Sequence, residues 1–575
     1  MRYTLSFDKA HQNYLDITLE IDSKGADQLR FQLPAWRPGR YELSNFAKNI
    51  QKWEVFDENN NALKFSKKTK DLWEVDCKDS KKVLVKYNYF ANELNAGSTY
   101  LDENQLYVNP VNCLMYEEQH LDTTCHLELK LPKNFQCATS LKSKEQFSFL
   151  AENFDELADS PFICSPNLQN ETYEIDETTF HLWFQGIFKP DWKLLKKDFQ
   201  AFSQEQMKLF GGFPGDEFHF LFQILPTATY HGVEHASSTV IALGPSYSLL
   251  KKSGRYEDLL GVSSHELFHA WNVKRIRPIE MWPYDFTKEN YTKMGYLTEG
   301  ATTWYGDIML YRSGVFDDEA FFRTFNQLLS RHYNNPGVLN LSVAASSFDT
   351  WLDGYVPGVP NRKSSIYAEG ALITFFLDVE IRKATENQQS FDQVLQSFYK
   401  DFYLKGKGIS EEDYRAVVEK IAGKKMDHIF NNFIYGKEDF SKQLKESFDF
   451  LGLEMTQKPS DFVHETYMGI RLLNDEVFSI YPDSPADLAG FSIGDKPVQI
   501  NGIEINQNFS EWLEYFINEE ITVGLMRKNG TYAELKLKST NKKMYYSNYV
   551  VSKLKNLNAS QKKAYDAWML TSDFH

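Results

Sequence analysis

The sequence predicts a multidomain protein with an amino-terminal β-sandwich, a mainly α-helical middle domain carrying a small sheet, and a carboxy-terminal α+β domain. Its 575 residues suggest three or four domains at about 150 residues each. Apolar residues recur with period two in the first third and with a helical period in the middle. Strand signals return near residue 460. We place the domains at 1–165, 166–455 and 456–545, followed by a tail at 546–575.

Charge and composition exclude several classes of partner. With 63 Lys and Arg against 79 Asp and Glu, the net charge is -16, so nucleic acid and anionic membranes would be repelled. No window approaches about 18 uninterrupted apolar residues, and the amino terminus lacks a signal-peptide pattern. The five cysteines include no CxxC pair, which favours a reduced environment. We therefore expect a cytoplasmic protein without a nucleic-acid or membrane partner.

Alternating apolar residues predict the amino-terminal strands. The clearest run is Leu15, Ile17, Leu19 and Ile21, and similar runs follow near residues 83–89. Period two with a wet outer face is typical of antiparallel strands. Turn-forming pairs such as Pro38-Gly39 separate the runs, which indicates a β-sandwich.

The period changes near Pro190, where the middle domain begins to form helices. One helical stripe ends at Gly211-Gly212, which can terminate a helix, and it consists of Leu195, Phe199, Phe202, Leu209 and Phe210. A strand with alternating apolar residues follows over 218–224. From about 255 to 440 the pattern is mostly helical.

The string SHELFH in the middle domain predicts a metal site. His265 and His269 are four residues apart, so on a helix they direct two imidazoles to one point, with Glu266 beside them. A catalytic zinc needs a third protein ligand and an open position for water, and Glu266 could take that water's proton. The alternative is an ordinary helix with a chance carboxylate. We expect the helix to begin after a turn at Gly261 and to end before Pro278.

The third ligand has to come from elsewhere in the chain. Residues 295–307 are predicted to form a second helix, with Glu299 near its start. Glu280 and Glu289 are nearer in sequence, but Glu280 lies beside prolines in an apparent loop, where a ligand is harder to hold rigidly. Glu299 is therefore the favoured third ligand.

The strings HELFHAWNVKRIRP and YLTEGATTWYGD resemble the glycyl aminopeptidase family of zinc peptidases, within the gluzincin group that uses two His and one Glu. The amino-terminal string WRPGRY is also similar to that family, so the resemblance extends over most of the chain. It implies a zincin-type catalytic domain with one Zn²⁺ per chain at His265, His269 and Glu299. Glu266 would then act as general base and proton shuttle.

The resemblance also implies catalytic and substrate-binding residues outside the metal site. Tyr367 matches the tyrosine that stabilises the oxyanion, a role suited to a preorganised hydroxyl donor, although a packed core tyrosine is the alternative. Related enzymes often carry Lys where this chain has Glu369. In YHGVEH, Gly232 and Glu234 match the segment that binds substrate, with Glu234 anchoring its free amino group. The alternative for Glu234 is an ion pair at a strand edge.

The carboxy-terminal strings MGIRL, SPADLAGFSIGD and VQING resemble a PDZ domain. Such a domain adds a peptide as an extra strand, and backbone amides at 468–470 could receive a terminal carboxylate. The alternative is a small domain that packs on the catalytic one and binds nothing. Asn529-Gly530 predicts a hairpin, and a short helix is expected near 561–570.

These features together predict a zinc-dependent aminopeptidase acting on peptides with a free amino terminus. It would hydrolyse the bond after a small first residue, by attack of a zinc-bound water activated by Glu266, and the family resemblance implies a Gly or Ala preference. Two alternatives remain: a zinc endopeptidase with an open cleft, and a catalytically inert PDZ-bearing protein that binds peptides. Only Glu234 separates the first two at this level, and the intact Glu266 counts against the last.

Overall fold

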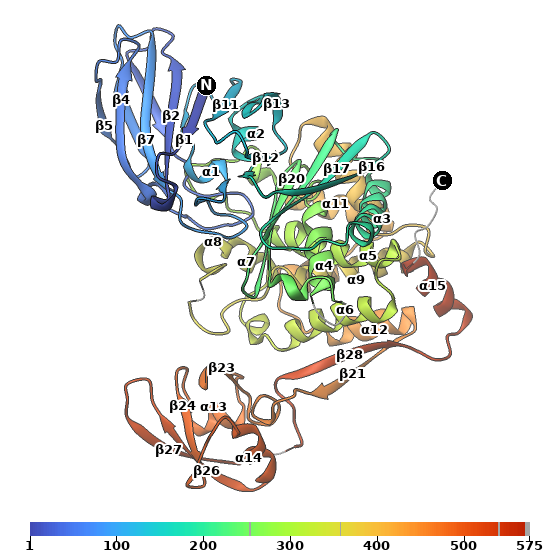
Figure 1. The fold of residues 1–575 in the computed structure, drawn as a ribbon. Coiled ribbons are helices and arrows are strands. Elements are labelled where there is room, and N and C mark those ends of the chain that lie inside the picture. The colour runs from blue at the N-terminus through green and yellow to red at the C-terminus, as the bar shows by residue number, and fades with distance from the viewer. Residues whose placement is uncertain (252–254, 357, 539–540, 570–575) are drawn as a thin grey trace.

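The computed structural model describes residues 1–251, 255–356, 358–538 and 541–569. The chain forms a sheet-rich amino-terminal domain, a helical middle domain and a small carboxy-terminal domain (Figure 1). The first domain contains the short helices α1 (Pro110–Cys113) and α2 (Phe154–Ala158). Its strands are β1 (Arg2–Ser6), β2 (Tyr14–Asp22), β3 (Gln28–Gln32), β4 (Ile50–Asp57), β5 (Lys64–Lys67), β6 (Leu72–Asp76), β7 (Lys82–Phe90), β8 (Tyr100–Leu101), β9 (Leu106–Val108), β10 (Tyr116–Glu117), β11 (Cys125–Leu129), β12 (Gln136–Thr139), β13 (Lys142–Glu145), β14 (Ser148–Ala151) and β15 (Phe162–Ser165).

Three sheets make up the amino-terminal domain. Seven strands follow the order β13-β14-β11-β1-β2-β7-β4, and two four-stranded sheets follow β10-β3-β6-β5 and β12-β15-β9-β8. The alternation predicted for β2 is confirmed, since Leu15, Ile17, Leu19 and Ile21 are all at most 4% exposed. These side chains join one hydrophobic core with residues of the other sheets. The sheet-rich character of this domain is therefore confirmed.

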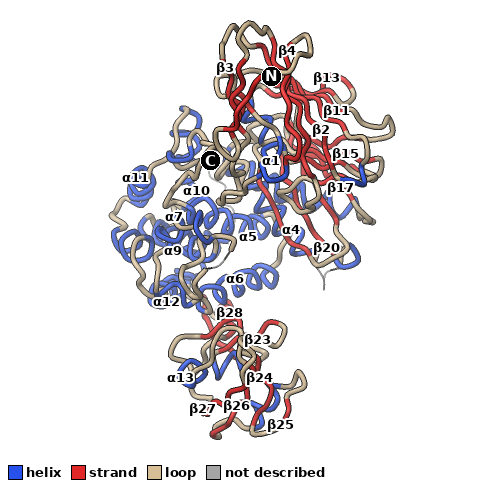
Figure 2. The backbone as a smooth tube through the Cα atoms, turned by 90° about the vertical axis from the view of Figure 1, so that its left-hand side faces the viewer, coloured by secondary structure: helices blue, strands red, loops and turns tan. Residues whose placement is uncertain are grey.

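The middle domain combines one mixed sheet with a body of helices. Its strands are β16 (Gln169–Ile175), β17 (Thr178–Gln185), β18 (Glu217–Ile224), β19 (Thr229–Glu234) and β20 (Ser238–Gly244). They follow the order β16-β17-β18-β20-β19, so β19 is an edge strand, antiparallel to β20. The helices are α3 (Trp192–Phe210), α4 (Tyr256–Phe268), α5 (Thr302–Arg312), α6 (Asp318–Tyr333), α7 (Val343–Phe348), α8 (Thr350–Asp353), α9 (Ala368–Ala384), α10 (Phe391–Ser397), α11 (Glu411–Ala422) and α12 (Ser441–Leu451). Strands and helices separate clearly when the backbone is coloured by secondary structure (Figure 2).

The helical predictions were correct for α3 and wrong for the start of α4. α3 ends at Phe210, and its cap Gly211 has φ 82°, a conformation that favours glycine. α4 begins at Tyr256, so Gly261 lies inside the helix and does not form the predicted turn. Two carboxylates in the first turn, those of Glu257 and Asp258, stabilise the earlier start through the helix dipole.

Glycines bring the segment bearing Glu299 close to α9. This segment is a π-helix, η5 (Tyr296–Ala301), which leads directly into α5. A β-carbon on Gly300 would overlap the backbone of Gly370 in α9. π-Helical turns are frequent at functional sites, because the widened turn changes where a side chain is directed.

The carboxy-terminal domain is reached and left through one ribbon, β21 (Leu453–Pro459) paired antiparallel with β28 (Ser547–Lys553). Figures 1 and 2 show this ribbon between the small domain and the helices. The domain contains β22 (Ile470–Leu473), β23 (Glu476–Ile480), β24 (Lys496–Ile500), β25 (Ile503–Glu504), β26 (Glu520–Met526), β27 (Tyr532–Lys538), α13 (Pro485–Ala489) and α14 (Phe509–Tyr515). The hairpin predicted at Asn529-Gly530 is confirmed by the pairing of β26 with β27.

The chain ends by returning to the helical domain. The last helix, α15 (Ala559–Met569), buries Trp568 completely, 5.7 Å from the ring of Phe375. The helix predicted near 561–570 is therefore present, although Leu570 lies outside the described residues. None of the helices in the described part of the chain is both long and apolar enough to cross a membrane.

Candidate metal centre and active site

Two histidines near the end of α4 and one glutamate in η5 converge on one point. Nε2 of His265 lies 3.0 Å from Nε2 of His269. Oε2 of Glu299 lies 3.4 Å from Nε2 of His269 and 4.0 Å from Nε2 of His265. Tetrahedral zinc with bonds of about 2.0–2.1 Å separates its ligand atoms by about 3.3 Å. The three atoms therefore fit around a single ion.

A hydrogen bond on the far side of His269 directs its Nε2 into this centre. Nδ1 of His269 donates to the backbone carbonyl of Asn272, at 2.7 Å. The Asn272 side chain in turn donates to Leu297 O at 2.9 Å and to Thr302 Oγ1 at 3.0 Å, on either side of Glu299. Asn272 thus fixes both His269 and the segment bearing Glu299, a role that the sequence reasoning missed.

The charges around the centre favour a cation. Burial alone would lower the pKa of His269, but the carboxylates of Glu299, Glu234 and Glu266 raise this pKa to about 10. The pKa of His265 lies well below its usual value because of burial and the neighbouring charge of His269. A divalent cation would take the place of the His269 proton, since metal binding to histidine releases protons.

Glu266 is a buried carboxyl beside the three ligand-type side chains. It is 5% exposed, and Oε2 has no hydrogen-bond partner among the described residues. Burial is the main cause that raises its pKa, and the carboxylates of Glu234 and Glu299 raise it further against the opposing effect of His269. Gly232 of β19 lies directly against it, since a β-carbon at that position would overlap the Glu266 carboxyl group. The backbone of the edge strand β19 therefore lies directly against the Glu266 side chain.

Glu234 ends β19 close to the same centre. It is 4% exposed, Oε1 has no hydrogen-bond partner, and no ion pair to it occurs within the described ranges. Oxygen atoms of Glu234, Glu266 and ring atoms of His269 lie within 4.8 Å of one another. Gly39 of the amino-terminal domain, at φ 81°, meets the Glu234 carboxylate so closely that a β-carbon would overlap it. Among the described residues, the ion pair considered as an alternative for Glu234 does not occur.

The amino-terminal domain contributes a loop to this site through residues 36–41. The Tyr41 hydroxyl donates to Oε1 of Glu299 at 3.4 Å, and Tyr41 N donates to the Tyr355 hydroxyl at 3.2 Å. Trp36 is fully buried and donates from Nε1 to Asp285 O at 2.8 Å. The sequence drew attention to WRPGRY only as a resemblance, so the contact of Tyr41 with Glu299 was not predicted.

Tyr367 immediately precedes α9 and is partly buried beside the centre. Burial and then the charge of Glu299 raise the pKa of its hydroxyl well above the usual value, so the phenol stays protonated and can donate. The hydroxyl makes no hydrogen bond to any described residue. Glu369 does not join the site, because its carboxylate pairs with Nδ1 of His332 at 3.1 Å. The Glu369 side chain therefore faces His332 and not the candidate metal centre.

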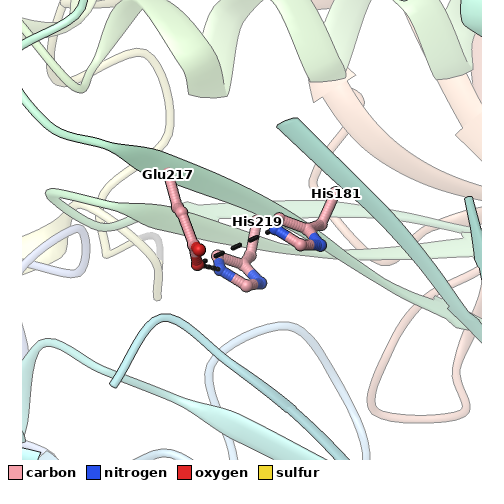
Figure 3. A group of neighbouring side chains, drawn as sticks. All are labelled: His181, Glu217 and His219. Atoms are coloured by element: carbon pink, nitrogen blue, oxygen red, sulfur yellow. Dashed lines mark hydrogen bonds and ion pairs between the residues drawn. The ribbon is translucent and has the colours of Figure 1, made fainter. Parts of the chain in front are cut away.

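A second group of ligand-type side chains lies on β17 and β18 (Figure 3). Oε2 of Glu217 lies 3.1 Å from Nε2 of His219 and 3.7 Å from Nε2 of His181. However, the Trp183 indole donates from Nε1 to Nδ1 of His219 at 3.2 Å. An imidazole that accepts at Nδ1 carries its proton on Nε2, where it donates to Glu217. We assign no metal to this group.

Comparison with known proteins agrees with the resemblance in two segments. Residues 2–166 match the Peptidase M61 N-terminal domain, and residues 258–373 match M61 glycyl aminopeptidase. The search of curated proteins found no match.

One solved structure shows the same fold over almost the whole chain. An aminopeptidase N family protein from Idiomarina loihiensis is 24% identical, with a TM-score of 0.90 over 98% of this chain and 99% of that one. An M1 zinc metallopeptidase from Deinococcus radiodurans is 15% identical, with a TM-score of 0.47 over 76% of this chain and 93% of that one. The high-scoring match confirms the sheet-rich and helical domain arrangement, and the two family matches support a metallopeptidase.

Proposed function

We propose that this protein is a zinc-dependent aminopeptidase of the gluzincin type that removes small amino-terminal residues from peptides. The observation that carries the proposal is the convergence of His265, His269 and Glu299 on one point, with the buried carboxyl of Glu266 beside it. The Gly or Ala preference rests on the resemblance to the glycyl aminopeptidase family, as does the gluzincin placement.

The ligand-type side chains suit one Zn²⁺ per chain. Two neutral imidazole nitrogens and one carboxylate are a common ligand set for catalytic zinc, and the carbonyl of Asn272 orients His269 for that purpose. When bound, zinc would supply Lewis acidity that polarises a peptide carbonyl and lowers the pKa of a water.

Glu266 and Tyr367 would carry the proton transfers and stabilise charge. Glu266 takes a proton from the attacking water and gives it to the nitrogen of the leaving amine, for which a raised pKa is suitable. The Tyr367 hydroxyl donates a hydrogen bond to the oxygen that becomes negative as the tetrahedral intermediate forms. Its lack of another hydrogen-bond partner supports this role.

Glu234 and β19 would select peptides with a free amino terminus. An edge strand can hydrogen-bond an extended peptide along its backbone, and Gly232 keeps that edge free of a side chain next to Glu266. The buried Glu234 carboxylate makes no ion pair in the described chain, although the buried Arg37 guanidinium lies near enough for their charges to interact. A substrate ammonium would therefore pair with it directly. Gly39 covers the end of the strand beyond Glu234, which favours an exopeptidase over an endopeptidase with an open cleft.

The carboxy-terminal domain is proposed to be PDZ-like. Ser484 caps α13 with its side chain and Gly490 ends that helix at φ 91°, and both residues lie in the string SPADLAGFSIGD that resembles a PDZ domain. The backbone N–H of Gly469 is bonded to His464 O, however, so this amide is not free for a terminal carboxylate.

A hydrolysis panel tests the proposed activity. Gly and Ala substrates with free and with acetylated amino groups are compared, and zinc is quantified in the same preparation. We expect one zinc per chain and cleavage of the free-amine substrates only. Equal cleavage of the free and blocked substrates would favour the endopeptidase alternative, and zinc without any hydrolysis would favour the inert peptide-binding protein.

A further inference from the structure

Two cysteines of the amino-terminal domain lie opposite each other on neighbouring strands. Cys137 of β12 pairs directly with Cys164 of β15 in the antiparallel register. Their Sγ atoms are 2.9 Å apart, and both residues are in the thiol form. The remaining cysteines make no contact with a second cysteine sulfur among the described residues, and they are Cys77, Cys113 and Cys125. Because the two opposed cysteines are 27 positions apart, no CxxC spacing marks the pair in the sequence.

This arrangement meets the geometric requirement for a disulfide. Residues directly opposite each other on antiparallel strands have Cα atoms about 4.5 or 5.5 Å apart, and disulfides accept Cα separations of about 4.4 to 6.8 Å. The two sulfur atoms have to approach from 2.9 Å to the S–S bond length of about 2.0 Å. The strand register therefore allows the bond to form without separating or sliding the strands.

The two thiols differ in their access to solvent. Cys164 is fully buried, and burial, followed by the neighbouring Cys137, raises the pKa of its thiol well above the usual value. Cys137 is partly exposed and lies on β12, an edge strand of the sheet that the structure describes. Oxidants react with the thiolate form, and they react with accessible thiols first. Cys137 is therefore the thiol that meets an oxidant, and Cys164 is placed to react with the product.

The cysteine pair lies behind the strand that approaches the metal centre. Both sulfurs face the core of the amino-terminal domain, where Cys164 is buried and Cys137 packs at the edge. Side chains alternate along a strand, so the adjacent Ala138 and Ile163 are directed to the opposite face. There they pack in one cluster with Val233 of β19. The pair thus joins two strands that support β19, while the sulfurs themselves are directed away from it.

We propose that Cys137 and Cys164 form a modification site at which hydrogen peroxide produces a reversible disulfide. The Cys137 thiolate attacks one peroxide oxygen, the O–O bond breaks, and a sulfenic acid and one water are formed. The Cys164 thiol then attacks the sulfur of that sulfenic acid, gives up its proton and releases a second water. Two thiols are oxidised by two electrons in total, and one peroxide is reduced to two waters. An added dithiol restores both thiols by thiol–disulfide exchange.

Mass spectrometry of the full chain tests this proposal. After stepwise addition of hydrogen peroxide, we expect the chain to lose two hydrogen atoms and two of its five free thiols. Proteolysis should then yield one cross-linked pair of peptides, containing Cys137 and Cys164, that dithiothreitol separates. Oxygen added to either cysteine without a cross-link, a bond between two chains, a different pairing, or no reaction overturns the proposal.

Matched variants test the order of the two steps. Cys164→Ser leaves the sulfenic acid without a thiol to attack it, so dimedone should label Cys137 in this variant after peroxide is added. Cys137→Ser should form neither the label nor the cross-link. The control is Cys77→Ser, because a serine hydroxyl can keep the hydrogen bond from Cys77 Sγ to Ala26 O at 3.1 Å, and this variant should still cross-link. Dimedone on another cysteine overturns the assignment, and circular dichroism verifies that each variant is folded.

The cross-link should also raise thermal stability. It closes a loop between residues 27 positions apart and so restricts the unfolded chain. We expect the first melting transition of the oxidised chain to rise by about 3 to 10 °C, with no rise in Cys137→Ser after the same treatment. A fall in the melting temperature of the cross-linked chain would overturn this stabilising role. None of these measurements uses peptide hydrolysis, so their outcome is independent of the proposed peptidase activity.

Discussion

Two groups of two histidines and one glutamate occur in the same domain. In both groups the glutamate oxygen lies at similar distances from the two imidazole Nε2 atoms. At the candidate metal centre the Glu299 carboxylate lies 3.4 and 4.0 Å from the Nε2 atoms of His269 and His265. On β17 and β18 the Glu217 carboxylate lies 3.1 and 3.7 Å from the Nε2 atoms of His219 and His181. Distance alone therefore does not distinguish a metal site from a hydrogen-bonded cluster.

The two groups differ in the hydrogen bond at Nδ1, the second ring nitrogen, of one histidine in each group. Asn272 O accepts a hydrogen bond from Nδ1–H of His269, which keeps the proton on Nδ1 and leaves the Nε2 lone pair for a metal. In contrast, the Trp183 indole donates to Nδ1 of His219, so the proton of that imidazole lies on Nε2. Ring orientation differs as well. His265 and His269 are nearly perpendicular at 86°, whereas His181 and His219 stack in parallel at 4°, so their lone pairs do not converge.

The largest expected effect comes from Glu299→Ala. Removing one of three ligands leaves an incomplete and open site, so the variant should lose its zinc and all activity while remaining folded. Zinc content after dialysis and circular dichroism check this. Full zinc occupancy in the variant would show that Glu299 is not a ligand. The group around Glu299 would then be no better supported as a metal site than the group around Glu217.

Glu266→Gln should separate binding from chemistry. The amide cannot accept the proton of the attacking water, so kcat should fall by about 10²- to 10⁴-fold while zinc content stays at the parent level. Steady-state kinetics and metal analysis on the same sample measure both. A variant that keeps most of its kcat would require another base.

Tyr367→Phe should lower kcat far more than it changes KM. The proposed hydrogen bond forms mainly as negative charge develops, and loss of such a donor costs on the order of 3 kcal/mol, or roughly a hundredfold in rate. The pair of constants is measured on a free-amine Ala substrate. If kcat is unchanged, Tyr367 only packs beside the centre.

Glu234→Ala should weaken activity on free-amine substrates and leave zinc in place. A charge-assisted contact is worth about 1.5 to 3 kcal/mol, which predicts a ten- to hundredfold loss in kcat/KM. Glu369→Ala is a suitable comparison, because Glu369 is also buried but faces His332. If the two variants lose the same activity with the same zinc content, the effect is structural.

The smallest expected effect on metal content is that of His219→Ala. Because this imidazole is held by Trp183 and Glu217, its removal should leave the zinc stoichiometry at one per chain. The variant should lose only stability, by about 0.5 to 3 kcal/mol, because the His219 side chain that is removed is itself buried, at 4% exposed. A fall in zinc content would mean that the second group also binds metal, and that the tautomer argument fails.

The sequence correctly predicted those features that depend only on residues within one strand, helix or turn. The burial of Leu15 to Ile21, the end of α3 at Gly211 and the β26–β27 hairpin each follow from residues within one element. The predicted start of α4 was wrong because a glycine does not by itself end a helix, and the residues on either side of Gly261 in the sequence, Leu260 and Val262, are buried helical residues. Tertiary contacts override such weak local preferences.

The parts of the site that escaped prediction depend on long-range contacts. The spacing of His265 and His269 is visible in one helical turn, but Tyr41 and Glu299 are 258 residues apart along the chain. Asn272 acts through a backbone carbonyl, which no side-chain motif records. The π-helix η5 also lies against Gly370, which belongs to another helix, and this contact cannot be seen from the spacing within either segment.

The β21–β28 ribbon determines how the protein could be shortened. Because Pro459 faces Ser547 across the ribbon, both ends of the small domain lie at one place, and a short linker joining them would excise the domain. Simple truncation after β21 would also remove α15, whose Trp568 is fully buried among the helices. The truncated chain should therefore aggregate, whereas the excised form should fold. Protein engineers can thus treat the small domain as an insertion, and not as an appended tail.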